Sequence, residues 1–153
     1  MLLFFAALAV VILDQAVKLW VVRNIALGSA GRTLIAGVLS LTHVRNEGAA
    51  FSLLSGGGGR FILSAVALLF AAAVLFAFRR GYIKTGREKL CYAMIAAGGL
   101  SNCIDRIVRG YVVDMFMVEL FDFAIFNLAD VFITVFCFAL IIITFTDVRQ
   151  ERT

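Results

Sequence analysis

Four long apolar segments dominate this chain and leave it few ways to fold. They cover about residues 2–22, 61–78, 90–108 and 126–146, and a membrane-spanning helix needs about 20 mainly apolar residues. Hydrophobic residues make up 63% of the 153 positions, whereas soluble domains contain about 45–50%. Because a chain this short cannot bury such an excess in one core, the sequence predicts an all-α integral membrane protein with four transmembrane helices.

The distribution of basic residues predicts the orientation in the membrane. Residues 79–89 carry five basic side chains, whereas the much longer stretch 23–60 carries four. The positive-inside rule therefore makes 79–89 a cytoplasmic loop. With four spans, both termini are also cytoplasmic, and the loops 24–60 and 109–123 share the external face. The net charge of +4 is small and scattered, which argues against a nucleic-acid partner and fits contact with membrane lipid.

The external loop 24–60 is the only long stretch that is not continuously apolar. Within it, Val38–Val44 alternates in polarity and is rich in β-forming residues, which predicts a strand. The four-glycine run Gly56–Gly59 predicts a flexible connector. We therefore expect a small extracytoplasmic β-cradle between helices 1 and 2, within a single membrane domain that comprises residues 1–153.

Charged side chains inside the apolar segments are a second constraint, because they are costly in lipid unless they pair or do chemistry. Asp14 and Lys18 lie one helical turn apart, so they are predicted to form an ion pair. Asn127 followed by Asp130 resembles a helix-capping pattern and predicts that Asp130 lies in the first turn of the last helix.

The third apolar segment is interrupted in the same way. Its purely apolar part, 90–100, covers about 17 Å, roughly half the thickness of the hydrocarbon layer. To cross, the helix must carry Asn102, Asp105 and Arg106 into the outer part of the membrane. Asp105 and Arg106 are candidates for a local ion pair. Since the other intramembrane polar groups also fall toward the external ends of their helices, we predict one polar cluster there.

Asp114 and Asp130 are candidates for acid–base chemistry within this cluster. They are 16 residues apart and belong to different elements, so their side chains can face each other. Two neighbouring carboxylates do not both ionise easily, and either one can keep the proton. The ionised carboxylate can take a proton from water while the protonated one donates to a peptide carbonyl. We expect no cofactor and no metal site, because the single histidine, His43, has no second His or Cys ligand nearby.

Three other functions compete with this hypothesis. A serine–lysine peptidase would use Lys18 as its base, but Asp14 one turn away keeps that lysine charged. The available serines are Ser52, Ser55 and Ser101. A proton-coupled transporter or channel subunit would use intramembrane aspartates such as Asp105 and Asp114 as relay groups, although no internal repeat is visible. A purely structural membrane anchor leaves the common depth of the polar groups unexplained.

Five sequence blocks in this order resemble the bacterial lipoprotein signal peptidases (signal peptidase II), which are membrane aspartic peptidases. The resemblance covers nearly the whole chain. The blocks are Asp14 and Lys18 in DQAVK, Asn46-Glu47-Gly48-Ala49-Ala50-Phe51, Asn102-x-x-Asp105-Arg106, Val112-Val113-Asp114, and Asn127-Leu128-Ala129-Asp130.

The resemblance implies an endopeptidase that removes the signal peptide of a prolipoprotein by cleaving before a diacylglyceryl-modified cysteine. Its catalytic pair corresponds to Asp114 and Asp130. The positions that support the site or bind substrate correspond to Asp14, Lys18, Asn46, Gly48, Asn102, Asp105, Arg106, Asn127 and Ala129. The resemblance also implies a four-helix protein of the bacterial cytoplasmic (inner) membrane, with the active site toward the external face, and inhibition by globomycin. The self-contained polar cluster predicts a monomer.

One position departs from the family pattern. The family usually has glycine before the asparagine of the third block, where this chain has Ser101. Its hydroxymethyl group is predicted either to crowd a close helix contact or to hydrogen-bond back along its own helix. The small residues Ala49 and Ala50, next to Gly48, are interpreted as room for a substrate chain.

Overall fold

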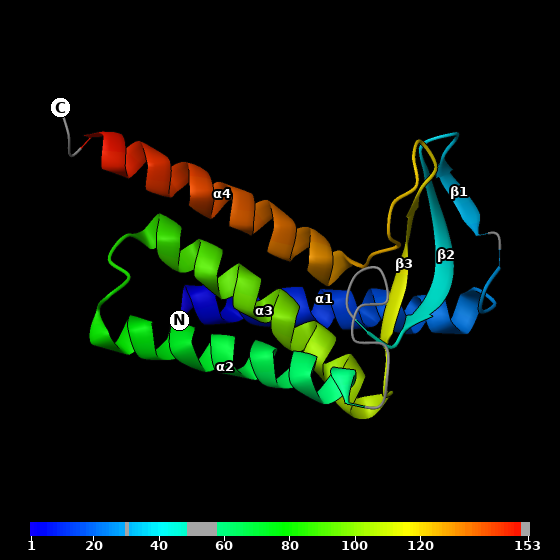
Figure 1. The fold of residues 1–153 in the computed structure, drawn as a ribbon, viewed down its shortest axis with the longest axis horizontal. Coiled ribbons are helices and arrows are strands. Elements are labelled where there is room, and N and C mark those ends of the chain that lie inside the picture. Colours follow the sequence, from blue (N-terminus) through cyan, green and yellow to red (C-terminus); the bar gives the residue numbers. More distant parts are fainter. Residues whose placement is uncertain (30, 49–57, 151–153) are drawn as a thin grey trace.

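Four helices and a small sheet make up the part of the chain that the computed structural model describes, residues 1–29, 31–48 and 58–150. The helices are α1 (Leu2–Asn24), α2 (Gly59–Arg80), α3 (Gly86–Val108) and α4 (Leu128–Gln150). The strands are β1 (Arg32–Ile35), β2 (Leu39–Asn46) and β3 (Val112–Val118). The sheet lies at one end of the helices, and the α2–α3 connection lies at the other (Figure 1). The predicted mainly helical fold with a small sheet is thus confirmed.

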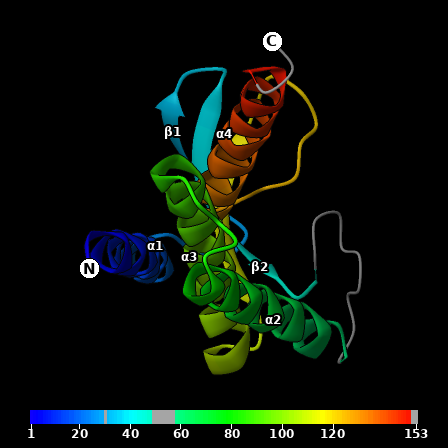
Figure 2. The same ribbon diagram turned by 90° about the vertical axis from the view of Figure 1, so that its left-hand side faces the viewer.

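Helix α3 is the central element, because it packs against α1, α2 and α4 (Figure 2). Its contact with the beginning of α4 is unusually close. A Cβ atom added at Gly98 would lie 2.7 Å from Ile133 Cγ1 and 2.8 Å from the Ala129 carbonyl oxygen, so only glycine allows this approach. The first turn of α4 is therefore held directly against α3.

Three of these helices suit a membrane. Among the described residues, the helical segments that are long and apolar enough to cross are Leu2–Asn24, Gly59–Arg80 and Leu128–Asp147. Large side chains on them are open to the surroundings; Phe4 and Phe145 are 66% and 73% exposed, as expected for contact with lipid. Helix α3 is also 23 residues long, but it contains several polar and charged residues and is not in this set. The fourth crossing therefore stays a prediction.

The sheet is antiparallel, with the order β1-β2-β3. The strand predicted at 38–44 is confirmed as β2. However, β3 lies in the segment 109–123 that was expected to be a loop, so the cradle does not come only from the chain between helices 1 and 2. The polarity of β3 does not alternate along the strand, because both faces of the strand are covered. Val113 and Met115 pack against α1, while Val112 and Asp114 on the opposite face line a cavity.

Two helices begin in places that apolar content does not reveal. Helix α3 begins at Gly86, inside the predicted cytoplasmic loop, where Thr85 and Glu88 form a capping box with reciprocal 3.1 Å hydrogen bonds. This polar first turn stabilises the helix without adding apolar residues. Gly59 is the first residue of α2, so the prediction of a flexible connector is wrong there; residues 56–57 lie outside the described part.

Candidate active site

A charged cluster centred on Lys18 joins α1 to α3. The Lys18 Nζ donates to Asp14 Oδ2, Asp105 Oδ2 and Asn102 Oδ1, each at 2.8 Å. Lys18, Asp14 and Asp105 are completely buried. An ammonium group has three hydrogens, and all three are used here. The predicted Asp14–Lys18 pair is confirmed, and it forms part of a larger network.

The predicted pairing of Asp105 with Arg106 is wrong. Asp105 instead pairs with Lys18 and with Arg109, which lies four residues further on, directly after the end of α3. Consecutive residues of a helix point in different directions, so Arg106 turns away from this cluster and donates to the Gly48 carbonyl at 3.2 Å. The i,i+4 spacing of Asp105 and Arg109 was a usable sequence signal for the correct partner.

Ser101 belongs to the same cluster. Its buried hydroxyl donates to Asp14 Oδ2 at 2.6 Å and accepts from Gln15 Nε2 at 3.1 Å. It therefore bonds to α1, so the predicted hydrogen bond back along its own helix is wrong, while the alternative of crowding at a helix contact stays a prediction. Gln15, which sequence reasoning missed, also donates to Asp105 and accepts from Arg109.

The cluster also holds the beginning of α4. The second oxygen of Asp14 accepts from the Ala129 backbone N–H at 2.9 Å. The first N–H groups of a helix lack partners within the helix, so a buried helix start needs such an acceptor. Ala129 is completely buried. Asp14 thereby joins the charged cluster to the turn that carries Asp130.

Asp114 lies on β3, opposite Val44 of β2. Both of its oxygens accept amide hydrogens: Oδ1 from Asn127 Nδ2 at 2.7 Å and Oδ2 from Asn46 Nδ2 at 2.8 Å. Asn46 reaches it because it pairs with Val112, two residues away on the same face of the sheet. Asp114 is thus held by two neutral donors.

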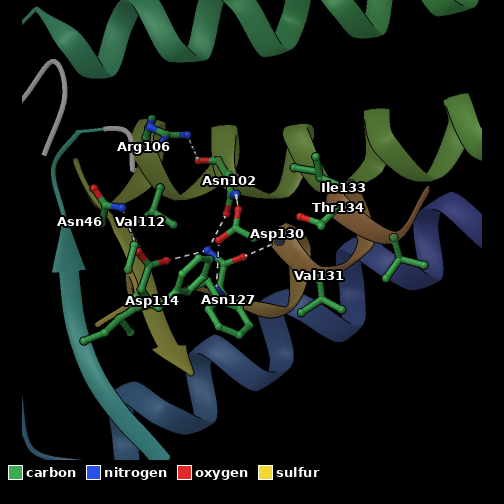
Figure 3. Close-up of a pocket in the computed structure, with 15 residues that line it drawn as sticks. Asn46, Asn102, Arg106, Val112, Asp114, Asn127, Asp130, Val131, Ile133 and Thr134 are labelled. Carbon is green, nitrogen blue, oxygen red and sulfur yellow. Dashed lines mark hydrogen bonds between the residues drawn. The ribbon is translucent and has the colours of Figure 1, made fainter. Parts of the chain in front are cut away.

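Asp130 lies in the first turn of α4, as predicted. Its Oδ1 accepts from Asn102 Nδ2 at 2.8 Å, and its Oδ2 accepts from the Asn127 N–H at 3.1 Å. In return, Asn127 Oδ1 accepts from the Asp130 N–H at 3.0 Å, which confirms the capping pattern. Figure 3 shows Asn127 between Asp114 and Asp130, joined to each of them by hydrogen bonds.

Three asparagine side chains donate to Asp114 and Asp130, and the orientation of their amides follows from neighbouring groups that can only donate. Each amide oxygen accepts from such a group, so each amide nitrogen must face a carboxylate. The pairs are Asn46 with Gly48 N, Asn127 with Asp130 N, and Asn102 with Lys18 Nζ. The amides therefore present N–H groups to both aspartates.

Burial raises the pKa of Asp114 from 3.8 to about 6, and the nearby negative charge of Asp130 adds to the increase. The hydrogen bonds from Asn46 and Asn127 favour the ionised form of Asp114, so they lower its pKa and offset part of this increase. Asp114 therefore keeps its proton much closer to neutral pH than an exposed aspartate does.

Both aspartates line a cavity of about 470 Å³. Arg106 lines it from α3, and most of the remaining wall is apolar, including Phe123, Phe126 and several residues of α4. A largely apolar cavity with a few converging polar groups is the usual form of a binding site. It suits a peptide chain with apolar side chains.

The predicted site residues fall into two groups. Those that line the cavity are Asp114, Asp130, Asn46, Asn102, Arg106 and Asn127. The others lie behind the lining: Lys18 and Gly48 bond directly to lining residues, whereas Asp14, Asp105 and Ala129 belong to the network around Lys18. The interpretation of Ala49 and Ala50 as room for substrate lies outside the described residues.

The sequence of this chain matches the family model "Signal peptidase (SPase) II" over residues 6–146. The chain belongs to the signal peptidase II family. It is similar to the lipoprotein signal peptidase of Streptococcus thermophilus (strain CNRZ 1066), at 44% identity over 142 residues, 93% of this chain and 91% of the relative. It is also similar to that of Streptococcus pyogenes serotype M2 (strain MGAS10270), at 39% identity over 132 residues, 86% of this chain and 85% of the relative.

Solved structures agree with the membership of the signal peptidase II family. One, described as "Bacterial membrane enzyme structure by the in meso method at 2.3 A resolution", superposes with a TM-score of 0.89 at 28% identity, covering 97% of this chain and 90% of that one. A second, described in the same words at 1.9 Å, gives 0.80 at 30% identity, covering 93% and 91%. The chain is therefore a peptidase, and the transporter and membrane-anchor alternatives are set aside.

Proposed function

We propose that this chain is a membrane-embedded aspartic endopeptidase that removes the signal peptide of prolipoproteins, cleaving before the diacylglyceryl-modified cysteine, with Asp114 and Asp130 as its catalytic pair. One observation carries the assignment of the pair. These two carboxylates come from separate elements, face one mainly apolar cavity and are held by neutral amides. Carboxylates held in this way can still exchange protons, whereas those of the Lys18 cluster are fixed by cations.

Asp114 acts as the acid and Asp130 as the base. The pKa of Asp114 is raised to about 6 by burial, with a further contribution from Asp130, so Asp114 is protonated below that pH and a fraction of it still carries the proton at neutral pH. Asp130 lies at the N-terminus of α4 and accepts two N–H hydrogen bonds, which favour its ionised form. Each oxygen of Asp114 already accepts one amide hydrogen. The remaining direction for the carboxyl proton of Asp114 is therefore into the cavity.

The reaction needs one water molecule between the two carboxylates and the scissile carbonyl. Asp130 takes a proton from the water molecule as the water oxygen bonds to the carbonyl carbon. At the same time, Asp114 gives its proton to the carbonyl oxygen. In the second step, Asp114 takes a proton back from the tetrahedral diol. The C–N bond then breaks as Asp130 protonates the leaving amine of the modified cysteine. Both aspartates return to their starting protonation states.

Arg106 binds the substrate backbone in this proposal. Its guanidinium group lines the cavity and is steadied by the carbonyls of Gly48, at 3.2 Å, and Asn102, at 3.4 Å. A guanidinium has five N–H donors, so it can also donate to a peptide carbonyl of the bound chain. The apolar wall at Phe123 and Phe126 receives apolar substrate groups.

The membrane setting follows from the same proposal. Helix α3 makes the fourth crossing, and both termini and the loop 79–89 are cytoplasmic. The cavity faces the external side of the bacterial cytoplasmic membrane, next to the sheet. The C-terminal end of α4 and the α2–α3 connection lie away from the sheet (Figure 1), which supports this topology. The protein acts as a monomer in contact with membrane lipid, as a single domain of residues 1–153, and globomycin inhibits it.

The serine–lysine alternative has little support from the geometry at Ser101. The hydroxyl of Ser101 donates to Asp14, and the three hydrogens of Lys18 go to other acceptors. Within the described ranges, no hydrogen bond joins this serine to the lysine. A base must be within hydrogen-bond reach of the hydroxyl that it activates.

The test uses the purified full chain in detergent micelles with a diacylglyceryl-modified prolipoprotein, and follows release of the signal peptide. Asp114→Asn and Asp130→Asn should each lower kcat by about 10³-fold or more, because each removes a proton-transfer group. Asp122→Asn is the matched control; this exposed aspartate should be replaceable without loss. Wild-type turnover by either dyad variant would refute the assignment.

A further inference from the structure

Asn127 is bonded to both members of the proposed catalytic pair. Its side-chain Nδ2 donates to Asp114 at 2.7 Å, its backbone N–H donates to Asp130 at 3.1 Å, and its Oδ1 accepts from the Asp130 N–H at 3.0 Å. Among the residues that the structure describes, no other residue is hydrogen-bonded to both carboxylates. Asp114 and Asp130 lie on different elements, so their separation depends on what joins them.

The backbone fixes Asn127 between these elements. The preceding residue, Phe126, is tied to β3, because its carbonyl accepts from the N–H groups of Met115 and Phe116 at 3.0 and 2.8 Å. The following residue, Leu128, is the first of α4. Asn127 thus occupies the single position where the strand that bears one aspartate meets the helix that bears the other.

The hydrogen-bonding capacity of the Asn127 amide is used within the protein. One hydrogen of Nδ2 goes to Asp114, and the other goes to Asn102 Oδ1 at 3.1 Å. The amide oxygen is used by Asp130, and Asn127 is completely buried. With both amide hydrogens committed, Asn127 has no donor left for substrate.

We propose that Asn127 is a positioning residue, which sets the distance and relative orientation of the two catalytic carboxylates through its Nδ2 group. This inference rests on the proposed function, since it concerns the same pair. It assigns two separable tasks to one side chain: the oxygen caps α4, and the nitrogen bridges to Asp114. Only the second task is required for turnover.

Substitutions can separate the two tasks. Asn127→Ser keeps an oxygen that caps the helix, because serine is as good an N-cap residue as asparagine, but it removes the amide donor. Asn127→Ala removes both. The two variants therefore differ in whether the helix cap is kept, and both lack the hydrogen bond from residue 127 to Asp114.

The experiment measures thermal unfolding and prolipoprotein cleavage for the full chain in detergent. We expect Asn127→Ser to unfold at a higher temperature than Asn127→Ala, while both lose kcat to the same extent, by about 100-fold as for misplaced catalytic groups. KM should stay within about twofold of wild type, because a positioning residue does not bind substrate. Activity that follows the order of stability, with Asn127→Ser near wild type, would overturn the inference. A large rise in KM at unchanged kcat would also overturn it.

The outcomes also separate this inference from the proposed function. If Asp114→Asn and Asp130→Asn abolish cleavage while Asn127→Ser cleaves normally, the catalytic pair stands and only the bridging role fails. If the aspartate variants retain activity, the proposed function itself fails, whatever Asn127→Ser does.

Discussion

Four aspartates lie close together in this protein, three of them buried and Asp130 half-buried, and they form two pairs that are held in opposite ways. Asp14 and Asp105 are neutralised by Lys18, and Arg109 adds a second cation at Asp105. Asp114 and Asp130 receive only amide N–H groups. An ion pair fixes a carboxylate in its charged form, whereas a buried carboxylate without a cation keeps a strong tendency to take up a proton. The first pair therefore builds the site and the second can do chemistry.

Hydrogen bonds through neutral groups link the Lys18 cluster to the region of Asp114 and Asp130. Asn102 accepts from Lys18 and donates to Asp130, and Asp14 accepts from the Ala129 N–H one residue before Asp130. The lysine thus orients Asn102 and the first turn of α4 without contacting either member of the proposed catalytic pair. A cation in direct contact with Asp114 would favour its ionised form and remove the acid from the reaction.

Removal of the central cation should give the largest effect on stability. Lys18→Met leaves two buried carboxylates without their shared partner, and breaking a buried ion pair costs about 3–5 kcal/mol. The free energy of unfolding in detergent, from a denaturant titration, should fall by that amount. The control is Arg87→Met, which removes the exposed pair with Asp147; it should cost less than about 1 kcal/mol. Equal losses in the two variants would contradict the distinction between the buried cluster and an ordinary surface pair.

A smaller effect is expected where α4 approaches α3. Gly98→Ala should lower the free energy of unfolding by about 1–3 kcal/mol, the usual cost of overpacking, because its Cβ would lie within 2.8 Å of Ile133 and Ala129. Cleavage should also slow, since the first turn of α4 carries Asp130. Gly99→Ala is the matched control, with a 3.7 Å contact to Ala67 Cβ, and it should be nearly neutral in both measurements. Equal behaviour of the two alanines would show that the close approach is not required.

The pH dependence of cleavage should show the weakest but most specific effect. With the pKa of Asp114 at about 6, the acid is protonated below that pH, so kcat/KM should fall about tenfold per pH unit above it. Asn46→Ala removes a hydrogen bond that favours the ionised form, so the alkaline limb should move to higher pH. Asn24→Ala, which loses only an exposed bond to the Trp20 carbonyl, should leave the profile unchanged. A limb that moves to lower pH in Asn46→Ala would contradict the role of Asp114 as acid.

Local features of this site were predictable because they depend on spacing along one helix. The Asp14–Lys18 pair and the Asn127–Asp130 cap both join residues three or four positions apart, and helix geometry brings such residues together. The pairing of Asp105 was missed although Arg109 has the same spacing. Ser101 could not be predicted, since its partner Asp14 is on another helix.

The strand β3 was missed for a different reason. A strand is recognised by alternating polarity, which requires one covered face and one exposed face. Residues Val112–Met115 are buried on both faces, so Asp114 within an apolar stretch resembled part of a loop. Only the packing of Val113 and Met115 against α1 reveals the strand that carries Asp114.

The sequence by itself determined the helices, the caps and the chemical identity of the site, because apolar length, short-range spacing and the five family blocks are all written along the chain. The tertiary structure decided which carboxylates became structural and which remained free to exchange protons. That difference depends on whether a cation contacts the carboxylate, as at Asp14 and Asp105, or only amide N–H groups do, as at Asp114 and Asp130. Such contacts join residues up to 115 positions apart, and they exist only after α1, α3, α4 and the sheet have packed together.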